Sequence, residues 1–198
     1  MNTMTPLESA ELGRALFYGI RRRRNYSQAL PLLMSAAKTG YVHWQYLVGY
    51  SLSHGLGVKR NLRAARHWYA KAGRRGHPGA LFNLALMYDL GEGVRPSPRK
   101  AFALYKRGAQ VGDAWSQCNL ALAYLSGLGT SRNVRAGVRW MRKAASQGDP
   151  SAQYNLGLAY LEGEGVRTNV KQARIWFGRA ARRGHRKAAR LLGSLRPN

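Results

Sequence analysis

The chain has 198 residues, of which 45% are apolar and 10% aromatic, so it can bury a core and is not compositionally disordered. It carries 33 Lys and Arg against 8 Asp and Glu, a net charge of +25 that favours anionic partners: nucleic acid, acidic proteins or anionic membrane surfaces. Its single cysteine, Cys118, excludes an intrachain disulfide, and we expect neither a secretory signal nor a membrane span. These features predict a soluble protein of the cytoplasm.

Three sets of residues recur every 36 positions along the chain, which predicts a repeat protein. One set precedes each of five apolar-periodic runs, where helix N-caps belong: Asn25, Asn61, Ser97, Asn133 and Asn169. A second set ends these runs, as left-handed glycines do: Gly40, Gly76, Gly112, Gly148 and Gly184. The third set interrupts each repeat in its middle: Gly19, Gly55, Gly91, Gly127 and Gly163. Each repeat therefore reads as helix A, a glycine-containing turn, helix B and a tight turn.

The apolar residues within the predicted helices keep the same step. The four internal A helices span 41–54, 77–90, 113–126 and 149–162. In the B helices a bulky row, Leu32, Trp68, Leu104, Trp140 and Trp176, runs beside a small row, Ala36, Ala72, Gly108, Ala144 and Ala180. Large residues beside small ones at a fixed phase are what neighbouring helix pairs need to interlock, so we expect the tryptophans in the core.

Residues 152–185, "AQYNLGLAYLEGEGVRTNVKQARIWFGRAARRGH", resemble the Sel-one-like repeat (SLR) family, relatives of the tetratricopeptide repeats with a longer glycine-bearing turn. The matching residues are Ala152, Asn155, Leu156, Gly157, Tyr160, Gly163, Gly165, Val166, Ala173, Trp176, Phe177, Ala180, Ala181 and Gly184. The resemblance covers repeats at about 5–40, 41–76, 77–112, 113–148 and 149–184, with a capping helix in 185–198. Repeat 1 departs from the pattern at Arg21 and Pro31, and repeat 2 at Trp44 and Leu52.

The resemblance implies one all-α domain over residues 1–198, a right-handed α/α solenoid that acts as an interaction scaffold without catalysis. It also implies that recurring A-helix positions line an inner, concave groove. Carried to this sequence, those positions are His43, Tyr46, Tyr50, Phe82, Asn83, Leu86, Trp115, Asn119, Leu122, Tyr154, Asn155 and Leu158. The phased asparagines suit the backbone of an extended peptide. Alternatively, Tyr46, Phe82 and Tyr154 simply pack between repeats, whereas Trp115, at a position otherwise small, is typical of a contact residue.

The internal A helices contain no Lys or Arg, so the basic residues gather in the turns and B helices. Two rows recur at the repeat step: Arg63, Arg99, Arg135 and Lys171, and then Lys71, Arg107, Lys143 and Arg179. The resemblance places the B helices on the outer face. With so few carboxylates, these rows are either solvated charge or a surface for an anionic partner.

Four consecutive arginines, Arg21, Arg22, Arg23 and Arg24, fall in the mid-repeat turn just before Asn25. In phase with them are the turns "GLGVKRN", "GEGVRPS", "GLGTSRN" and "GEGVRTN". We therefore interpret the run as a basic loop of an ordinary repeat, with membership of a larger basic surface as the next reading. A nuclear-targeting signal is the less specific alternative.

The sequence favours a bacterial-type SLR scaffold over an enzyme. The five histidines show no metal-ligand spacing, Cys118 has no in-phase activating residue, and no phosphate loop or acidic dyad occurs, so we expect no metal, cofactor or small-molecule substrate. The partner is predicted to be another protein, offering a peptide segment or an acidic surface. The alternatives are nucleic acid bound by the basic rows, whose affinity would fall steeply with salt, and an anionic membrane surface.

Overall fold

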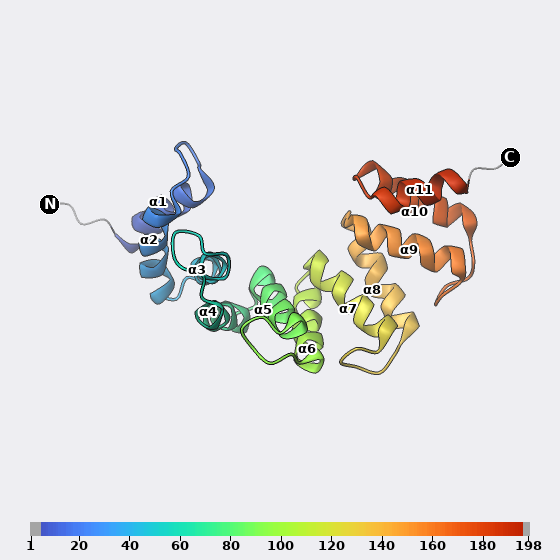
Figure 1. Cartoon of the computed structure of the whole chain (residues 1–198), viewed down its shortest axis with the longest axis horizontal. Coiled ribbons are helices and arrows are strands. Elements are labelled where there is room, and N and C mark those ends of the chain that lie inside the picture. Colours follow the sequence, from blue (N-terminus) through green and yellow to red (C-terminus); the bar gives the residue numbers. More distant parts are fainter. Residues whose placement is uncertain (1–4, 196–198) are drawn as a thin grey trace. The chain divides into compact units, whose positions relative to one another are not determined.

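The computed structural model describes residues 5–195, which form helices joined by turns, with no strand in that range (Figure 1). The helices are α1 (Pro6–Tyr18), α2 (Tyr26–Lys38), α3 (Val42–His54), α4 (Leu62–Arg74), α5 (Pro78–Leu90), α6 (Pro98–Gln110), α7 (Ala114–Ser126), α8 (Val134–Ser146), α9 (Pro150–Glu162), α10 (Val170–Arg182) and α11 (Arg186–Ser194). Odd-numbered helices are the predicted A helices and even-numbered ones the B helices. The all-α repeat solenoid is confirmed; what was expected of residues 1–4 and 196–198 lies outside the described residues.

The chain groups into two compact units, Met1–Ser97 and Pro98–Asn198. In unit 1, α1 packs on α2, α2 on α3, α3 on α4 and α4 on α5. In unit 2, the same order runs from α6 to α11. Each helix thus packs mainly on its neighbours along the chain, as in stacked repeats.

Four of the five predicted N-caps of the B helices are confirmed, and Ser97 before α6 stays a prediction. The side-chain oxygens of Asn25, Asn61, Asn133 and Asn169 accept hydrogen bonds from the backbone N–H groups three residues later, at 2.9–3.1 Å. Each bond satisfies one of the free donors at a helix start. A helix that begins at a fixed residue presents the same face in every repeat.

The cores combine small residues with a few large ones. In unit 1, Leu33, Leu47, Tyr69 and Leu81 are almost completely buried. In unit 2, the cluster around Met141 and Leu156 contains five alanines: Ala121, Ala144, Ala145, Ala152 and Ala159. Alanine allows neighbouring helices to approach closely, and the large side chains fill the space between repeats.

The second glycine of each mid-repeat turn couples one repeat to the one before it. Gly57, Gly93, Gly129 and Gly165 have φ values of 66–74° and lie against the first residue of the preceding helix B, which is Tyr26, Leu62, Pro98 and Val134 respectively. A Cβ on any of these glycines would overlap that residue. We call this first residue of helix B, which receives the glycine turn, the turn seat.

Arg21 occupies the same turn position in the first repeat. Its φ of 55° makes it the one non-glycine residue with positive φ among residues 5–195. No helix B precedes α1 in the described chain, so the Arg21 side chain has no turn seat to overlap. Arginine there meets only the left-handed backbone penalty of about 1–2 kcal/mol.

The turn seat predicts unequal costs for two glycine substitutions in unit 1. Gly76→Ala places a Cβ in open space at φ 82°, so it should lower the free energy of unfolding by about 1 kcal/mol. Gly57→Ala adds an overlap with the Tyr26 carbonyl group, which should cost about 1–3 kcal/mol more. Urea unfolding followed by circular dichroism measures both variants. Equal losses of unfolding free energy in the two variants would contradict the close packing of Gly57 on Tyr26.

Candidate binding surfaces

The predicted groove residues of unit 1 lie on the A-helix surface formed by α3 and α5. His43 is exposed, whereas Tyr46, Tyr50, Phe82, Asn83 and Leu86 are half-buried. Tyr46 packs against rings of α4 and of the turn before α5, with its centroid 6.2 Å from Tyr69 and 4.4 Å from His77. Tyr46 therefore contributes to packing between repeats as well as to this surface.

A pocket of about 450 Å³ opens on this surface at the C-terminal ends of α3 and α5. We call it the unit 1 pocket. Its lining residues are Ser53, His54, Arg60, Leu62, Tyr69, Asn83, Leu86, Met87 and Glu92. Two of these, Asn83 and Leu86, are among the groove residues given above.

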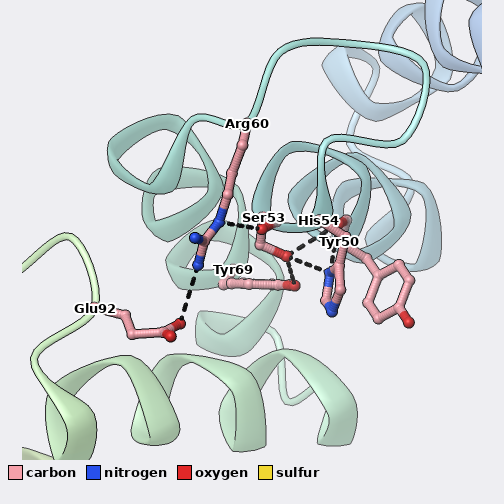
Figure 2. Close-up of polar contacts among 6 residues, drawn as sticks. All are labelled: Tyr50, Ser53, His54, Arg60, Tyr69 and Glu92. Atoms are coloured by element: carbon pink, nitrogen blue, oxygen red, sulfur yellow. Dashed lines mark hydrogen bonds and ion pairs between the residues drawn. The ribbon is translucent and has the colours of Figure 1, made fainter.

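A hydrogen-bond network built on Ser53 forms the wall of this pocket (Figure 2). Ser53 Oγ lies 2.9 Å from the Tyr69 hydroxyl, 2.8 Å from His54 Nδ1 and 2.9 Å from the Tyr50 carbonyl oxygen. Burial raises the pKa of Tyr69 well above its usual value, so its hydroxyl stays protonated, and either hydroxyl can donate in its hydrogen bond with Ser53. The His54 ring stacks on Tyr50 at 4.1 Å. The network therefore holds an exposed imidazole at the pocket mouth.

An arginine closes the turn beside this pocket, and the same contact recurs elsewhere. Arg60 Nε donates to the Ser53 carbonyl at 3.0 Å, and its Nη2 lies 3.6 Å from Glu92 (Figure 2). In unit 2, Arg132 donates to the Leu125 carbonyl at 2.9 Å and pairs with Glu164 at 2.7 Å.

Arg24 makes a similar bond in the first repeat, to the Tyr18 carbonyl at 3.2 Å, one residue later along helix A than the acceptors of Arg60 and Arg132. All four arginines of the run are exposed. The last arginine of the run therefore closes the end of helix A. The recurrence of arginine at 24, 60 and 132 is visible in the sequence, but its structural role was not predicted.

Two histidines, His77 and His185, are helix N-caps. His77 Nδ1 accepts from the Ala80 N–H at 3.3 Å, and His185 Nδ1 from the Ala188 N–H at 3.2 Å. His77 stacks on Tyr46, and His185 stacks on Tyr154, with centroids 4.4 Å apart in both pairs. This pairing can be read from the sequence. A tyrosine stands 31 residues before each of the two histidine caps, whereas Phe82 and Cys118 stand 31 residues before Asp113 and Asp149 at the same cap position.

His77 also lies beside a second histidine. Its Nε2 is 3.3 Å from His43 Nδ1. Burial, with a smaller contribution from His43, lowers the pKa of His77 to about 4. Burial and Arg14 lower the pKa of His43 as well, while Glu11 opposes this shift. The pair is therefore neutral near pH 7.

In unit 2, α7 carries the exposed part of the A-helix surface. Trp115 is 60% and Leu122 is 42% exposed. Asn119 donates its amide N–H to the Trp115 carbonyl at 2.9 Å, and Asn83 of unit 1 bonds the Tyr69 hydroxyl, so the phased asparagines do not act alike. Tyr154 and Leu158 pack against the α10–α11 core, and Asn155 is half-buried beside them.

The two predicted basic rows lie on the B helices. The first row is exposed and stands at the second residue of each helix: Arg63, Arg99, Arg135 and Lys171. In the second row, which lies eight residues further along each helix, Arg107, Lys143 and Arg179 are exposed. Lys71 is half-buried.

The tryptophans beside the second row were expected in the core, and they lie at its edge. Trp68, Trp140 and Trp176 are half-buried, and Trp140 and Trp176 pack against the core cluster around Met141 and Leu156. Each ring also lies under a cation three residues later on the same helix. Lys71 Nζ lies 5.3 Å from the Trp68 centroid, Lys143 Nζ 4.4 Å from Trp140, and the Arg179 guanidinium carbon 4.5 Å from Trp176. Residues three apart are neighbours on a helix, and an aromatic face attracts a cation.

Residues 5–195 contain no group of three or more His, Cys, Asp or Glu side chains placed to hold a metal ion. The Cys118 thiol is buried, and burial, reinforced by Asp149, raises its pKa to about 12. It is therefore a thiol rather than a reactive thiolate at neutral pH. None of the helices in this range is long and apolar enough to span a membrane.

The chain is similar to known repeat proteins throughout its length. The Sel1 repeat family model matches residues 10–41, 45–77, 78–113, 116–149 and 150–185. A Sel1 repeat protein from Oxalobacter formigenes has a TM-score of 0.89 at 28% identity, over 96% of this chain and 78% of that one. A protective antigen of uropathogenic Escherichia coli with an SLR fold has a TM-score of 0.90 at 29% identity, over 96% of this chain but 41% of the antigen.

A third similar structure is more distant. Cysteine rich protein B of Helicobacter pylori has a TM-score of 0.54 at 24% identity, over 68% of this chain and 97% of that one, a likeness of fold alone. A search of curated protein sequences gives no match.

The neutral His43–His77 pair predicts that acid weakens unit 1. Folding lowers the pKa of His77 from 6.5 to about 4, so the stability it contributes is complete above pH 6.5 and is lost as the pH falls towards 4. For this half-buried, partly screened ring we expect a loss on the order of 1–2 kcal/mol.

His77→Asn keeps an N-cap acceptor without a titrating group. Its urea midpoint should change less between pH 7 and pH 4.5 than that of the unsubstituted chain. His185→Asn, the same change at the equivalent cap in unit 2, controls for the lost tyrosine stack. An unchanged pH dependence in His77→Asn would refute the assignment.

Proposed function

The chain belongs to the Sel1 repeat family, whose members are generally protein-interaction scaffolds, and we propose that it is a non-catalytic scaffold that binds a protein partner through its A-helix surface. The partner contributes a peptide segment with apolar or aromatic side chains. The absence of Lys and Arg from α3, α5, α7 and α9 argues against an acidic peptide on this surface. Apolar and amide side chains remain as the contacts.

The unit 1 pocket is the observation that carries the proposal. Its volume of about 450 Å³ lies within the range of ligand pockets and accommodates one or two side chains. Leu62, Leu86 and Met87 offer apolar contact, and Asn83 and His54 offer hydrogen bonds. The Ser53–Tyr69 network ties the end of α3 to the middle of α4, so the pocket is pre-organised and loses little entropy on binding.

The exposed face of α7 supports the same function in unit 2. Trp115 and Leu122 are seven residues apart, so they lie on one side of the helix. Tryptophan is the residue most enriched among the side chains that dominate binding energy. We propose that these two side chains anchor the partner.

Replacing Trp115 and Leu122 with alanine should weaken partner capture while the helices remain intact. Loss of one such anchor typically costs at least about 2 kcal/mol, a reduction of about 30-fold in affinity. The measurement is affinity purification with quantitative mass spectrometry, with circular dichroism as the check on folding. Leu128→Ala, at an exposed residue of the following turn, is the matched control. An identical set of partners for all variants would refute the role of α7.

A second candidate function, polyanion binding by the B helices, is favoured by the cation–tryptophan pairs. At least 25 of the 33 basic side chains have no side-chain carboxylate to pair with one-to-one. Lys143 and Arg179 present their charge above half-buried rings in unit 2, which holds each cation at the surface of its helix. Nucleic acid is a polyanion whose phosphates bind such surface cations.

Reversing Arg99, Arg135 and Lys171 to Glu should reduce binding to single-stranded DNA and flatten its salt dependence. Each lost phosphate contact lowers the slope of log K against log salt by about 0.7. Reversing Arg21, Arg22 and Arg23 changes the net charge equally and is the control for a non-specific effect. If both triple variants weaken binding equally, the binding depends on net charge alone and not on the basic rows. If the unsubstituted chain does not bind single-stranded DNA at about 50 mM salt, this function is excluded.

A further inference from the structure

One repeated position links the tight turns that separate each helix B from the next helix A. In unit 1, Arg75 donates to the Gly40 carbonyl of the turn 35 residues earlier. In unit 2, Gln147 donates to the Gly112 carbonyl at 3.0 Å and to the Gln117 amide oxygen at 2.8 Å. The side chain at this position therefore covers the preceding turn, and in unit 2 it also satisfies a buried amide.

Arg183 stands at the same position after the Gly148 turn but makes neither bond. Its guanidinium lies over Gly148, where an added Cβ would be 2.7 Å from Arg183 Cζ, yet it forms no hydrogen bond with residues 5–195. Gln153, the equivalent of Gln117, is 4% exposed. Its Nε2 donates to the Ala145 carbonyl at 3.1 Å, whereas its Oε1 has no partner among the described residues. An unpaired buried acceptor is unfavourable, so this turn lacks one donor.

A hollow of about 340 Å³ opens at this turn, beside the C-terminal end of α10. We call it the Gly148 hollow. Gln153 and three exposed arginines, Arg179, Arg182 and Arg183, are among its lining residues, and none of the lining residues is acidic. The Arg179 guanidinium is held at the surface by the ring of Trp176. Three guanidinium groups that converge on one hollow attract an anion.

This collection of cations is not a general property of the repeat. The helices that surround the equivalent Gly112 turn, α6, α7 and α8, have their counterparts here in α8, α9 and α10. At the Gly112 turn, however, Lys143, Ser146 and Gln147 take the places of the three arginines. At the Gly40 turn, where Lys71, Arg74 and Arg75 stand, Arg75 is already bonded to the turn. The Gly148 hollow therefore combines a covering arginine that is not bonded to its turn with an unpaired buried amide oxygen.

The groups around the hollow define its ligand. Guanidinium groups donate hydrogen bonds in pairs, as phosphate and carboxylate oxygens require, whereas Gln153 Oε1 accepts one. The amide cannot turn its own donor towards the hollow, because the Ala145 carbonyl holds Nε2. The ligand is therefore an anion that also carries a hydrogen-bond donor. Free phosphate at neutral pH retains a P–OH group, and a phosphorylated residue offers its backbone N–H, whereas sulfate has no proton to donate.

We propose that the Gly148 hollow binds a phosphate group, with the arginines on its oxygens and the ligand's own donor on Gln153 Oε1. The donor is the P–OH of free phosphate or the N–H of a phosphorylated residue. The hollow contains none of the A-helix surface residues and only Arg179 of the two basic rows. Its function is therefore independent of the scaffold function proposed above.

The test titrates inorganic phosphate into the isotope-labelled chain at about 150 mM salt, which screens the general attraction of the positive charge. Shifts should change at the Gly148 amide and at the Gln153 side-chain amide. Acetylated and amidated phosphoserine is the second ligand, and the tighter of the two identifies the source of the phosphate. Sulfate should bind at least about 10-fold more weakly than the tighter ligand, because it leaves the acceptor unpaired. Equal binding of sulfate, or shifts confined to other turns, would overturn the proposal.

Arg183→Gln is the first variant, because it copies Gln147 at the equivalent turn. The new amide should bond Gln153 Oε1 and weaken phosphate binding at least about 10-fold, while the urea midpoint stays equal or rises. Arg174→Gln is the control, since it removes one charge from the same helix outside the hollow, and it should leave binding unchanged. Equal losses in both variants would show attraction by net charge alone and refute the site.

A pair of glycine variants tests the placement of the Arg183 side chain. Gly148 and Gly112 have φ values of 94° and 93°, so alanine brings the same backbone penalty at either position. At Gly148 the added methyl meets the Arg183 guanidinium, whereas at Gly112 it meets nothing within 4 Å. Gly148→Ala should therefore weaken phosphate binding, and Gly112→Ala should not. Equal phosphate affinities in the two variants would contradict the role of Arg183.

Discussion

The contact on which the repeats depend is the close approach of one glycine to the start of the preceding helix B. Burial alone allows neighbouring helices to slide, because apolar attraction has little direction. A Cα packed on a carbonyl group has no such freedom, since even one methyl group would overlap. The asparagine caps fix where each B helix begins, and the glycine turn then fixes where the next repeat lies on it. Together they convert a sequence period into a constant structural step.

The A helices and the B helices of this fold form surfaces of different chemical character. The internal A helices carry no Lys or Arg, and at the ends of α3 and α5 their side chains help to surround a pocket. The B helices turn cations outwards, three of them above tryptophan rings. A single chain therefore presents two surfaces with different chemistry, one suited to apolar side chains and one to anions.

The period of 36 residues was enough to predict the helices, their asparagine caps and the turn glycines, because each depends on residues close in sequence. It also identified Arg21 as an exception in its turn. The unit 1 pocket was not predictable, because Ser53, Tyr69 and Asn83 come from three helices and no period relates them. The tryptophans, expected in the core, lie half-buried at its edge, and the contacts with the cations three residues later were not predicted. The roles of the groove and the basic rows remain predictions.

The order of the turn seats also bears on how the chain folds during synthesis. Tyr26 is covered by Gly57, Leu62 by Gly93, Pro98 by Gly129 and Val134 by Gly165, always by a residue 31 positions later. On the ribosome, each B helix therefore emerges with an apolar end that stays uncovered until 31 more residues have been added. At about 5–20 residues per second this delay lasts about 2–6 seconds, long enough for a chaperone to bind the nascent chain.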